Sequence, residues 1–323
     1  MRPIYFPLET VTRTVPLGLR CVDIATGAQV AGGLSVTATP RERPARPARA
    51  ALTPSGVYAL HNLPGLVELE FADEAPSPAS PPASPPGSEF VVVVEDFESR
   101  YLPYAMTLTL PRRSLLTTFL FSVPSRGGAT GLMSIRGSLK DSTRTLADGS
   151  LRPAAFARVV AEYETTSPPT IFVGLADWRG EFALFMPGPN PLQPPEGVAV
   201  TSPNAPGRQT IAQLRWPVTL GFFYEPQAQQ FVTADERGRV EIIEGQQDGL
   251  TDVAPDSART RYFPVLASLL NQSDASVFEV AGASGPPAAA LAAEIEYGKD
   301  LVVRTREAPD SSVWLVPPAV VSP

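Results

Sequence analysis

The chain has few of the residues from which most catalytic and metal sites are built. It contains one cysteine, Cys21, and one histidine, His61, in 323 residues. A single cysteine cannot form an internal disulfide, so folding needs no oxidising compartment. The usual nitrogen and sulfur ligands of a zinc site cannot be assembled from these two residues. The sequence therefore predicts no metal site and no cofactor.

Lysine is scarce, and long apolar runs are absent. Lys140 and Lys299 are the only lysines among 26 basic residues, the others being arginine. No run of about 18 apolar residues occurs, and the opening MRPIYFPLETV lacks the apolar core of a secretory signal. We expect no membrane span and cytoplasmic synthesis without a signal peptide. The formal net charge of −7 argues against binding to duplex nucleic acid.

Proline and glycine are abundant, with 37 and 24 residues. Proline removes a backbone donor and breaks helix interiors, which excludes a helical bundle. Short strand-like runs follow one another with turn signals every 8–12 residues, a pattern typical of antiparallel β-sandwiches. We predict a mainly β chain with tandem sandwiches. It divides into an N-terminal lead (1–13), a first β-sandwich (14–112), a linker (113–129), a second β-sandwich (130–250) and a small α+β C-terminal region (251–323).

Some segments have more specific predictions. In the C-terminal region, helices are predicted at 262–271 and 288–297, and strands at 301–305 and 313–316. The turn at 234–240 is assigned to a hairpin of the second sandwich. Because proline cannot donate to a ladder, three Pro-rich segments are predicted to be loops without regular strands. These are residues 40–50, 74–88 and 187–207.

The two predicted sandwiches share short motifs. In each, a polar turn ends in glycine and an aromatic residue follows two positions later: Gly56 with Tyr58, and Gly180 with Phe182. Glycine supplies the positive φ that a tight hairpin needs. Tyr58 and Phe182 are therefore predicted to be buried equivalents.

These motifs carry a family resemblance. Residues 21–30 with 53–58, and 136–160 with 177–182, combine an early strand, an "ATG" or "ADG" turn, a second strand and a "D-W-R-G-E-F"-type turn. The arrangement resembles the carboxypeptidase regulatory-like, or transthyretin-like, β-sandwich modules. The resemblance implies a non-catalytic accessory or assembly domain, of a kind also found in phage tails and tail-like contractile injection particles. It makes a virion or a released particle the expected location.

No catalytic constellation is visible. A nucleophilic Cys21–His61 pair would need a third, orienting group, and the sequence favours a buried cysteine and a turn histidine instead. We predict that the chain is not an enzyme. Contacts with other protein subunits are expected from arginine, proline and aromatic residues in loops. The interface candidates are Arg41, Arg43, Arg46, Arg49, Trp178, Trp216 and Trp314.

Two functions remain open. The first is a structural subunit of a large assembly, phage-tail-like or contractile, that binds its neighbours through Pro-rich loops and strand edges. The alternative is a module that binds carbohydrate or a cell surface through an aromatic platform near Trp178.

Overall fold

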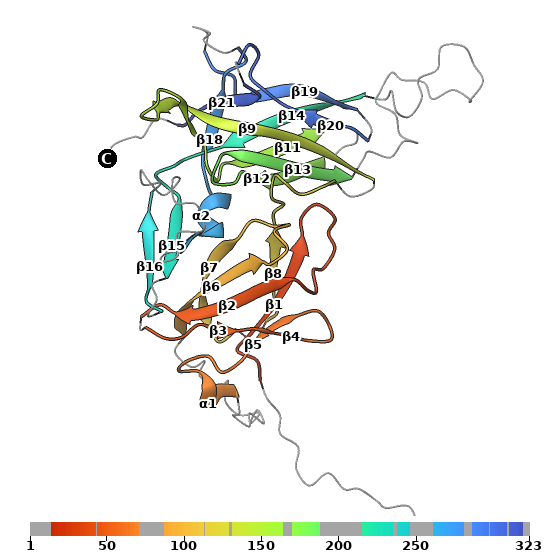
Figure 1. Ribbon diagram of the computed structural model, residues 1–323. Coiled ribbons are helices and arrows are strands. Elements are labelled where there is room, and N and C mark those ends of the chain that lie inside the picture. The colour runs from red at the N-terminus through yellow and green to blue at the C-terminus, as the bar shows by residue number, and fades with distance from the viewer. Residues whose placement is uncertain are drawn as a thin grey trace, which may run out of the picture.

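The computed structural model (Figure 1) is built mainly of β-strands, which confirms the predicted fold class at that level. The described part of the chain contains two helices, α1 (Val67–Glu70) and α2 (Leu266–Leu270). The described residues are 14–42, 44–70, 87–112, 114–128, 131–163, 170–187, 215–234, 238–245, 261–280, 286–296, 298–308 and 310–318.

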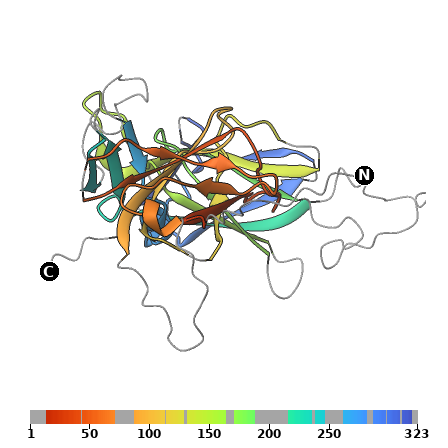
Figure 2. The same ribbon diagram turned by 90° about the horizontal axis from the view of Figure 1, so that it is seen from below.

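The first half of the chain forms two four-stranded sheets. In sheet I, β1 (Leu17–Asp23) pairs antiparallel with β5 (Tyr58–Leu60) and parallel with β8 (Leu116–Leu120), and β4 (Ala51–Leu52) lies beyond β5. In sheet II, the order is β3 (Ala48–Arg49), β2 (Leu34–Pro40), β6 (Ser88–Asp96) and β7 (Tyr104–Leu110). The view from below (Figure 2) has this half in front.

Both sheets contribute to one hydrophobic cluster. Alternate residues of a strand point to the same face, so Leu17, Leu19 and Cys21 of β1 are fully buried. In β6, Phe90 and Val92 are buried in the same cluster. The two sheets therefore face each other across a shared core.

The long strand β9 (Leu132–Thr145) organises one side of the second half. It pairs antiparallel with β13 (Glu181–Pro187) and β10 (Leu151–Pro153). It pairs parallel with β20 (Asp300–Val302) and β21 (Ser312–Val316). Strands from both ends of this half of the sequence are thus neighbours.

The opposite side of the second half is organised by β14 (Arg215–Phe223). This strand lies between β11 (Arg158–Tyr163) and β19 (Ala290–Glu296), and β12 (Thr170–Leu175) pairs with β11. Strand β18 (Asp274–Val277) pairs with both β14 and β21 and so links the two sides into one ten-stranded sheet. Its core includes the buried side chains of Ile135, Phe182, Trp216, Phe222 and Leu315.

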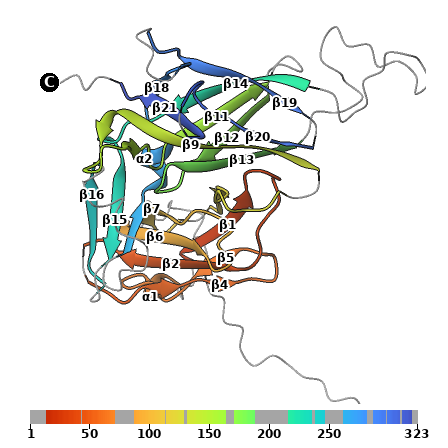
Figure 3. The ribbon, with the colours of Figure 1, turned by 45° about the horizontal axis from the view of Figure 1, so that its top comes forward.

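A third sheet connects the halves. It consists of β15 (Gln230–Ala234) between β16 (Val240–Glu244) and β17 (Arg261–Pro264). Val232 and Phe263 pack against Val91 of β6 and Ala105 of β7, on the outer face of sheet II. Figure 3 shows β15 and β16 standing beside both halves. The hairpin assigned from the sequence to the second sandwich is therefore present, but it covers the first.

The C-terminal residues differ from the sequence predictions in one main respect. The helix predicted at 288–297 is wrong, because residues 290–296 are strand β19 and bury Ile295 against the core. Pairing with β14 overrides the helix propensity of its alanines and glutamates. The helix predicted at 262–271 is correct only in part, because α2 occupies 266–270 whereas residues 261–264 form strand β17. β20 and β21 lie where strands were expected. Strands β18–β21 pair with β9 and β14 of the predicted second sandwich. They therefore do not form the separate α+β region that the sequence predicted at 251–323.

Two loop predictions also change. Residues 113–129 were predicted to be a linker, but β8 lies within them, because it completes sheet I beside β1. In the Pro-rich segment 40–50, which was predicted to contain no strand, Pro40 ends β2 and Ala48–Arg49 form the two-residue strand β3. β3 lies at the edge of sheet II, where proline-rich sequence is tolerated. Most of the other two Pro-rich segments lies outside the described residues.

The two glycine turns have the same geometry. The N–H of Gly56 donates to the Thr53 carbonyl at 2.9 Å, and the N–H of Gly180 donates to the Asp177 carbonyl at 3.0 Å. The φ angles of the glycines are 75° and 76°. Tyr58 and Phe182 are both buried, as predicted.

Gly180 should tolerate alanine less well than another positive-φ glycine, Gly149. A Cβ at Gly180 would lie 2.4 Å from the Leu139 carbonyl oxygen, whereas a Cβ at Gly149 meets nothing within 4 Å. The left-handed backbone alone costs alanine about 1–2 kcal/mol. We expect Gly149→Ala to lower the free energy of unfolding by roughly that amount and Gly180→Ala by roughly 3 kcal/mol or more, because of the added overlap. Urea unfolding measures both, and equal losses would contradict the close approach.

Candidate functional site

The arginine loop predicted as an interface lies on the surface. Arg41, Arg46 and Arg49 are exposed, and Arg43 lies outside the described residues. The Arg41 guanidinium pairs with Glu89 at 2.7 Å. The third sheet touches this loop closely, because a Cβ on Gly238 would lie 2.3 Å from the Ala45 carbonyl oxygen.

The three tryptophans occupy different settings. Trp216 is fully buried in the core of the second half, so its prediction as an interface residue is wrong: strand alternation turns it inward from β14. Trp178 is half-buried, with the Arg179 guanidinium 4.6 Å from its ring centroid. Trp314 lies on β21, half-buried, and donates its indole N–H to the Ser312 hydroxyl at 3.2 Å. Trp216 therefore cannot contribute to an exposed aromatic platform.

Cys21 and His61 are not brought together. Cys21 is buried in β1, and burial raises the pKa of its thiol to about 12. Leu60 pairs with Leu17, so His61 lies about five positions from Cys21, or about 16 Å along the strand. His61 instead faces the buried Glu70 carboxylate, at 3.7 Å from Nδ1.

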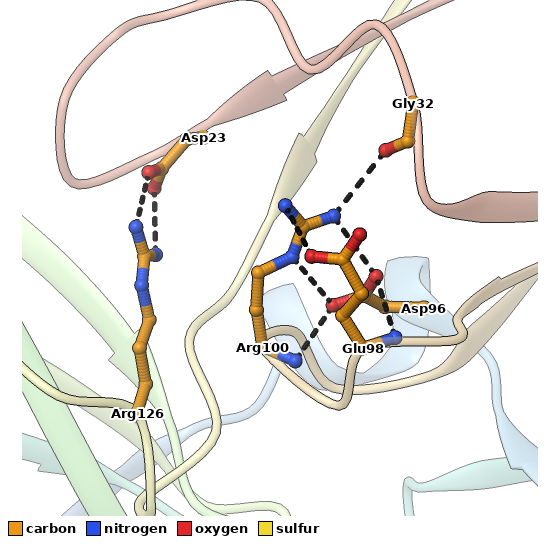
Figure 4. Close-up of polar contacts among 6 residues, drawn as sticks. All are labelled: Asp23, Gly32, Asp96, Glu98, Arg100 and Arg126. Carbon is orange, nitrogen blue, oxygen red and sulfur yellow. Dashed lines mark hydrogen bonds and ion pairs between the residues drawn. The ribbon is translucent and has the colours of Figure 1, made fainter.

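A group of polar contacts lies where the two halves meet. The Arg126 guanidinium donates to both carboxylate oxygens of Asp23, at 3.2 and 2.7 Å (Figure 4). Asp23 ends β1, and Arg126 follows β8 by six residues. Their side chains are 4% and 16% exposed. Such a bidentate pair, largely shielded from water, fixes both distance and orientation.

From the second half, Arg136 of β9 holds the same segment. Its guanidinium donates to the carbonyls of Pro124 and Arg126, the latter at 2.8 Å. Arg126 and Arg136 also lie over the Phe185 ring, 5.6 and 5.2 Å from its centroid. The segment that joins the halves is thus clamped by one guanidinium of its own and one from β9.

A second ion-pair group borders this junction. Arg100 donates from its side chain to both carboxylate oxygens of Asp96 at 3.1 Å, and it pairs with Glu98 at 3.0 Å (Figure 4). It also reaches the Gly32 carbonyl at 3.3 Å. Both Arg100 and Arg126 stack on Tyr101, at 5.3 and 4.9 Å from the ring centroid.

The electrostatics of these carboxylates do not suit proton transfer near neutral pH. Burial tends to raise the pKa of Asp23, but hydrogen bonds and the positive charge of Arg126 outweigh it and leave the pKa below its usual value. The same balance, with Arg100, lowers the pKa of Asp96. A general base is most effective when its pKa lies near the working pH. The junction therefore holds chain segments in place and is poorly suited to acid–base catalysis.

Sequence reasoning did not find the junction. Asp23 and Arg126 are 103 positions apart, and no motif of the sequence links them. The only signal is indirect: Asp23 lies just before the "ATG" turn at 25–27, where an Asx side chain often caps backbone N–H groups.

One carboxyl group shows the opposite shift. Asp177 begins the second glycine turn and accepts hydrogen bonds from the N–H groups of Arg179 and Glu181, at 2.8 and 2.9 Å. Burial nevertheless raises its pKa to about 6.

Within the described residues, no group of three or more His, Cys, Asp or Glu side chains could hold a metal ion, and no helix is long and apolar enough to cross a membrane.

Comparison with known proteins gives little. No protein-family model and no curated protein matches the chain. A solved structure described as a "putative adhesin" from Bacteroides ovatus is similar at 10% identity, over 96% of this chain and 94% of its own. Its TM-score is 0.21, which is too low to indicate a shared fold.

The Asp23–Arg126 pair should couple more strongly than an exposed pair of equal length. We expect a double-mutant cycle with Asp23→Asn and Arg126→Gln to give a coupling energy of about 2 kcal/mol, since hydrogen bonds to charged groups are strong when shielded. The exposed Arg41–Glu89 pair, also at 2.7 Å, should give roughly 0.5 kcal/mol. Chemical denaturation of the seven proteins, the wild type and three variants for each pair, measures both couplings, and equal couplings would show that the junction pair is only a surface contact.

Asp177 should make the fold less stable as pH rises. Its folded pKa lies above the unfolded value of 3.8, so the folded state binds more protons between these values and stability declines from pH 4 to 6.5. Asp177→Asn should remove that part of the slope. Carboxyl-carbon NMR of the folded protein should show a titration near pH 6 that is missing in the variant. A midpoint below 4 would refute the shift.

Proposed function

We propose that this chain is a non-catalytic structural subunit of a larger protein assembly, built from two β-sandwich modules. The proposal rests on one observation: the ionisable groups at the junction pair with one another and hold chain segments in place. The Asp23 and Asp96 carboxylates are committed to arginines that hold loops and the joining segment in place. The one cysteine and the one histidine are apart. Such a chain is suited to hold its shape within an assembly.

The strand order supports the two-module description. In the first half, β5-β1-β8 faces β3-β2-β6-β7; in the second, β13-β9-β20 corresponds to the former set and β12-β11-β14-β19 to the latter. Corresponding pairs agree in direction, including the parallel pairs β1–β8 and β9–β20. On this reading, β15 to β18 are an insertion between β14 and β19, and the C-terminal strands complete the second module.

The glycine turns support the same reading at the level of single atoms. Thr53 Oγ1 accepts the N–H of Val57 at 3.0 Å, and Asp177 Oδ1 accepts the N–H of Glu181 at 2.9 Å. A polar side chain therefore performs the same role at both turns. This similarity favours the transthyretin-like resemblance and the assembly role that it implies.

The proposal predicts that the native protein sediments as part of a particle. A tagged chain, produced in its own cells, should co-sediment with large complexes, and negative-stain images of that fraction test the tail-like identity implied by the resemblance. Arg46→Glu with Arg49→Glu should reduce incorporation several-fold without unfolding, because both side chains are exposed on a segment expected to meet neighbours.

Two variants serve as controls. Arg20→Glu reverses an exposed arginine on β1, and His61→Ala removes the only histidine; both should leave incorporation unchanged. A wild-type chain found only as free monomer would contradict the proposal. So would a folded His61→Ala protein that assembles normally but has lost an enzymatic turnover.

A further inference from the structure

The outer edge of β19 has no partner strand within the described residues. β19 pairs with β14 over seven consecutive positions without a shift, from Arg215↔Glu296 to Gly221↔Ala290. On its other side the described part of the chain offers only the bridge between Ala288 and Val277, which lies before the strand begins. Figure 1 shows β19 along the top of the molecule. One row of its backbone N–H and C=O groups therefore faces outward.

The strand of the first half that corresponds to β19 is β7, and its outer edge is covered. β7 follows β6 in the strand order as β19 follows β14. At β7, however, Ala105 forms a parallel bridge with Val265, and α2 and β17 pack beside the strand. Among the residues that the structure describes, one of these two edges is thus covered by the chain itself and the other has no partner strand.

β19 has little of the usual protection of an edge strand. Proteins protect such edges with charged side chains, lysine above all, and with proline, bulges or very short strands. The charged residues of β19 are Glu294 and Glu296, and both pair with basic side chains. β3 and β4 each have two residues, whereas β19 has seven, with the sequence ALAAEIE and an unbroken register. An open edge of this length is a template for another strand.

The core-facing side chains of β19 are incompletely covered. Ile295 is fully buried, but Leu291 and Ala293, which pack against the same core, are only half-buried. A further strand placed beside β19 would remove more of their apolar surface from water.

We propose that this edge binds the same edge of a second copy of the chain, with the two β19 strands antiparallel about a two-fold axis at Ala293. This inference rests on the proposed function and names one neighbour in the assembly. The register places Leu291 opposite Ile295 on the core side and Ala292 opposite Glu294 on the other. Cross-strand apolar pairs of this kind stabilise sheets.

The charges permit this pairing. The acidic groups of β19 are Glu294 and Glu296, and in this register neither lies directly opposite another carboxylate. Arg215 approaches Glu296 at 2.9 Å and Glu294 at 3.7 Å, and Lys299 also pairs with Glu296. The strand is therefore self-complementary, as the isologous interface of a two-fold dimer requires.

A cysteine at the axis tests the register in the purified full-length protein. Ala293→Cys places two thiols directly opposite each other, within the Cα separation that a disulfide spans. Cys21 is buried and remains a thiol. Mild oxidation should convert most of the variant to a covalent dimer. Ala292→Cys, whose thiols lie two positions apart along the paired strands, should cross-link far less; equal cross-linking of both variants, or of neither, would overturn the proposed register.

A charge exchange tests the interaction without a covalent bond. Ala292→Glu puts carboxylates opposite Glu294 at two symmetric places and should weaken dimerisation about tenfold in analytical ultracentrifugation. Adding Glu294→Lys to that variant should restore it. Ala51→Glu, the same change on exposed β4, is the matched control and should have no effect.

The outcomes separate this inference from the proposed function. A wild-type protein that stays monomeric at about 100 μM, well above the Kd of most specific complexes, overturns the β19 pairing. The sedimentation of the native protein would still decide whether it belongs to an assembly. A dimer unaffected by Ala292→Glu would place the interface elsewhere and also overturn the inference.

Discussion

The apolar contact between the third sheet and the outer face of sheet II determines how the whole chain is arranged. Val91 and Ala105 would face water if sheet II stood alone, and Val232 and Phe263 bury them. To make this contact, the chain leaves the second half after β14 and returns to it at β18. The two halves are therefore connected by packed sheets as well as by the segment that joins them.

The arginine junction adds direction to this apolar contact. Hydrophobic burial is not directional, so it brings the halves together without fixing their rotation. A bidentate guanidinium–carboxylate pair and guanidinium bonds to two carbonyls constrain angles as well as distances. With Arg126 held by Asp23 and Arg136 bonded to the same segment, the joining segment has a defined orientation.

The sequence predicted the features that depend on local patterns. The mainly β class, the positive-φ glycines and the burial of Tyr58 and Phe182 follow from turn chemistry and alternation. The features it missed depend on pairing between distant segments. β19 has a helix-like composition and becomes a strand only because β14 lies beside it. Strand alternation turns Trp216 inward, and it is buried because distant strands of the second half build a core around it. Asp23 and Arg126 show no local sign of their contact.

The insertion between β14 and β19 has a consequence for synthesis on the ribosome. The chain emerges from the N-terminus, so sheet II can form long before Phe263 and Val265 leave the exit tunnel. During that interval Val91 and Ala105 are uncovered, and such surfaces are sites of aggregation. The interval closes only when some 150 further residues have been added after β7, at about 5–20 residues per second. A nascent chain of this protein therefore exposes this apolar surface for roughly 8 to 30 seconds.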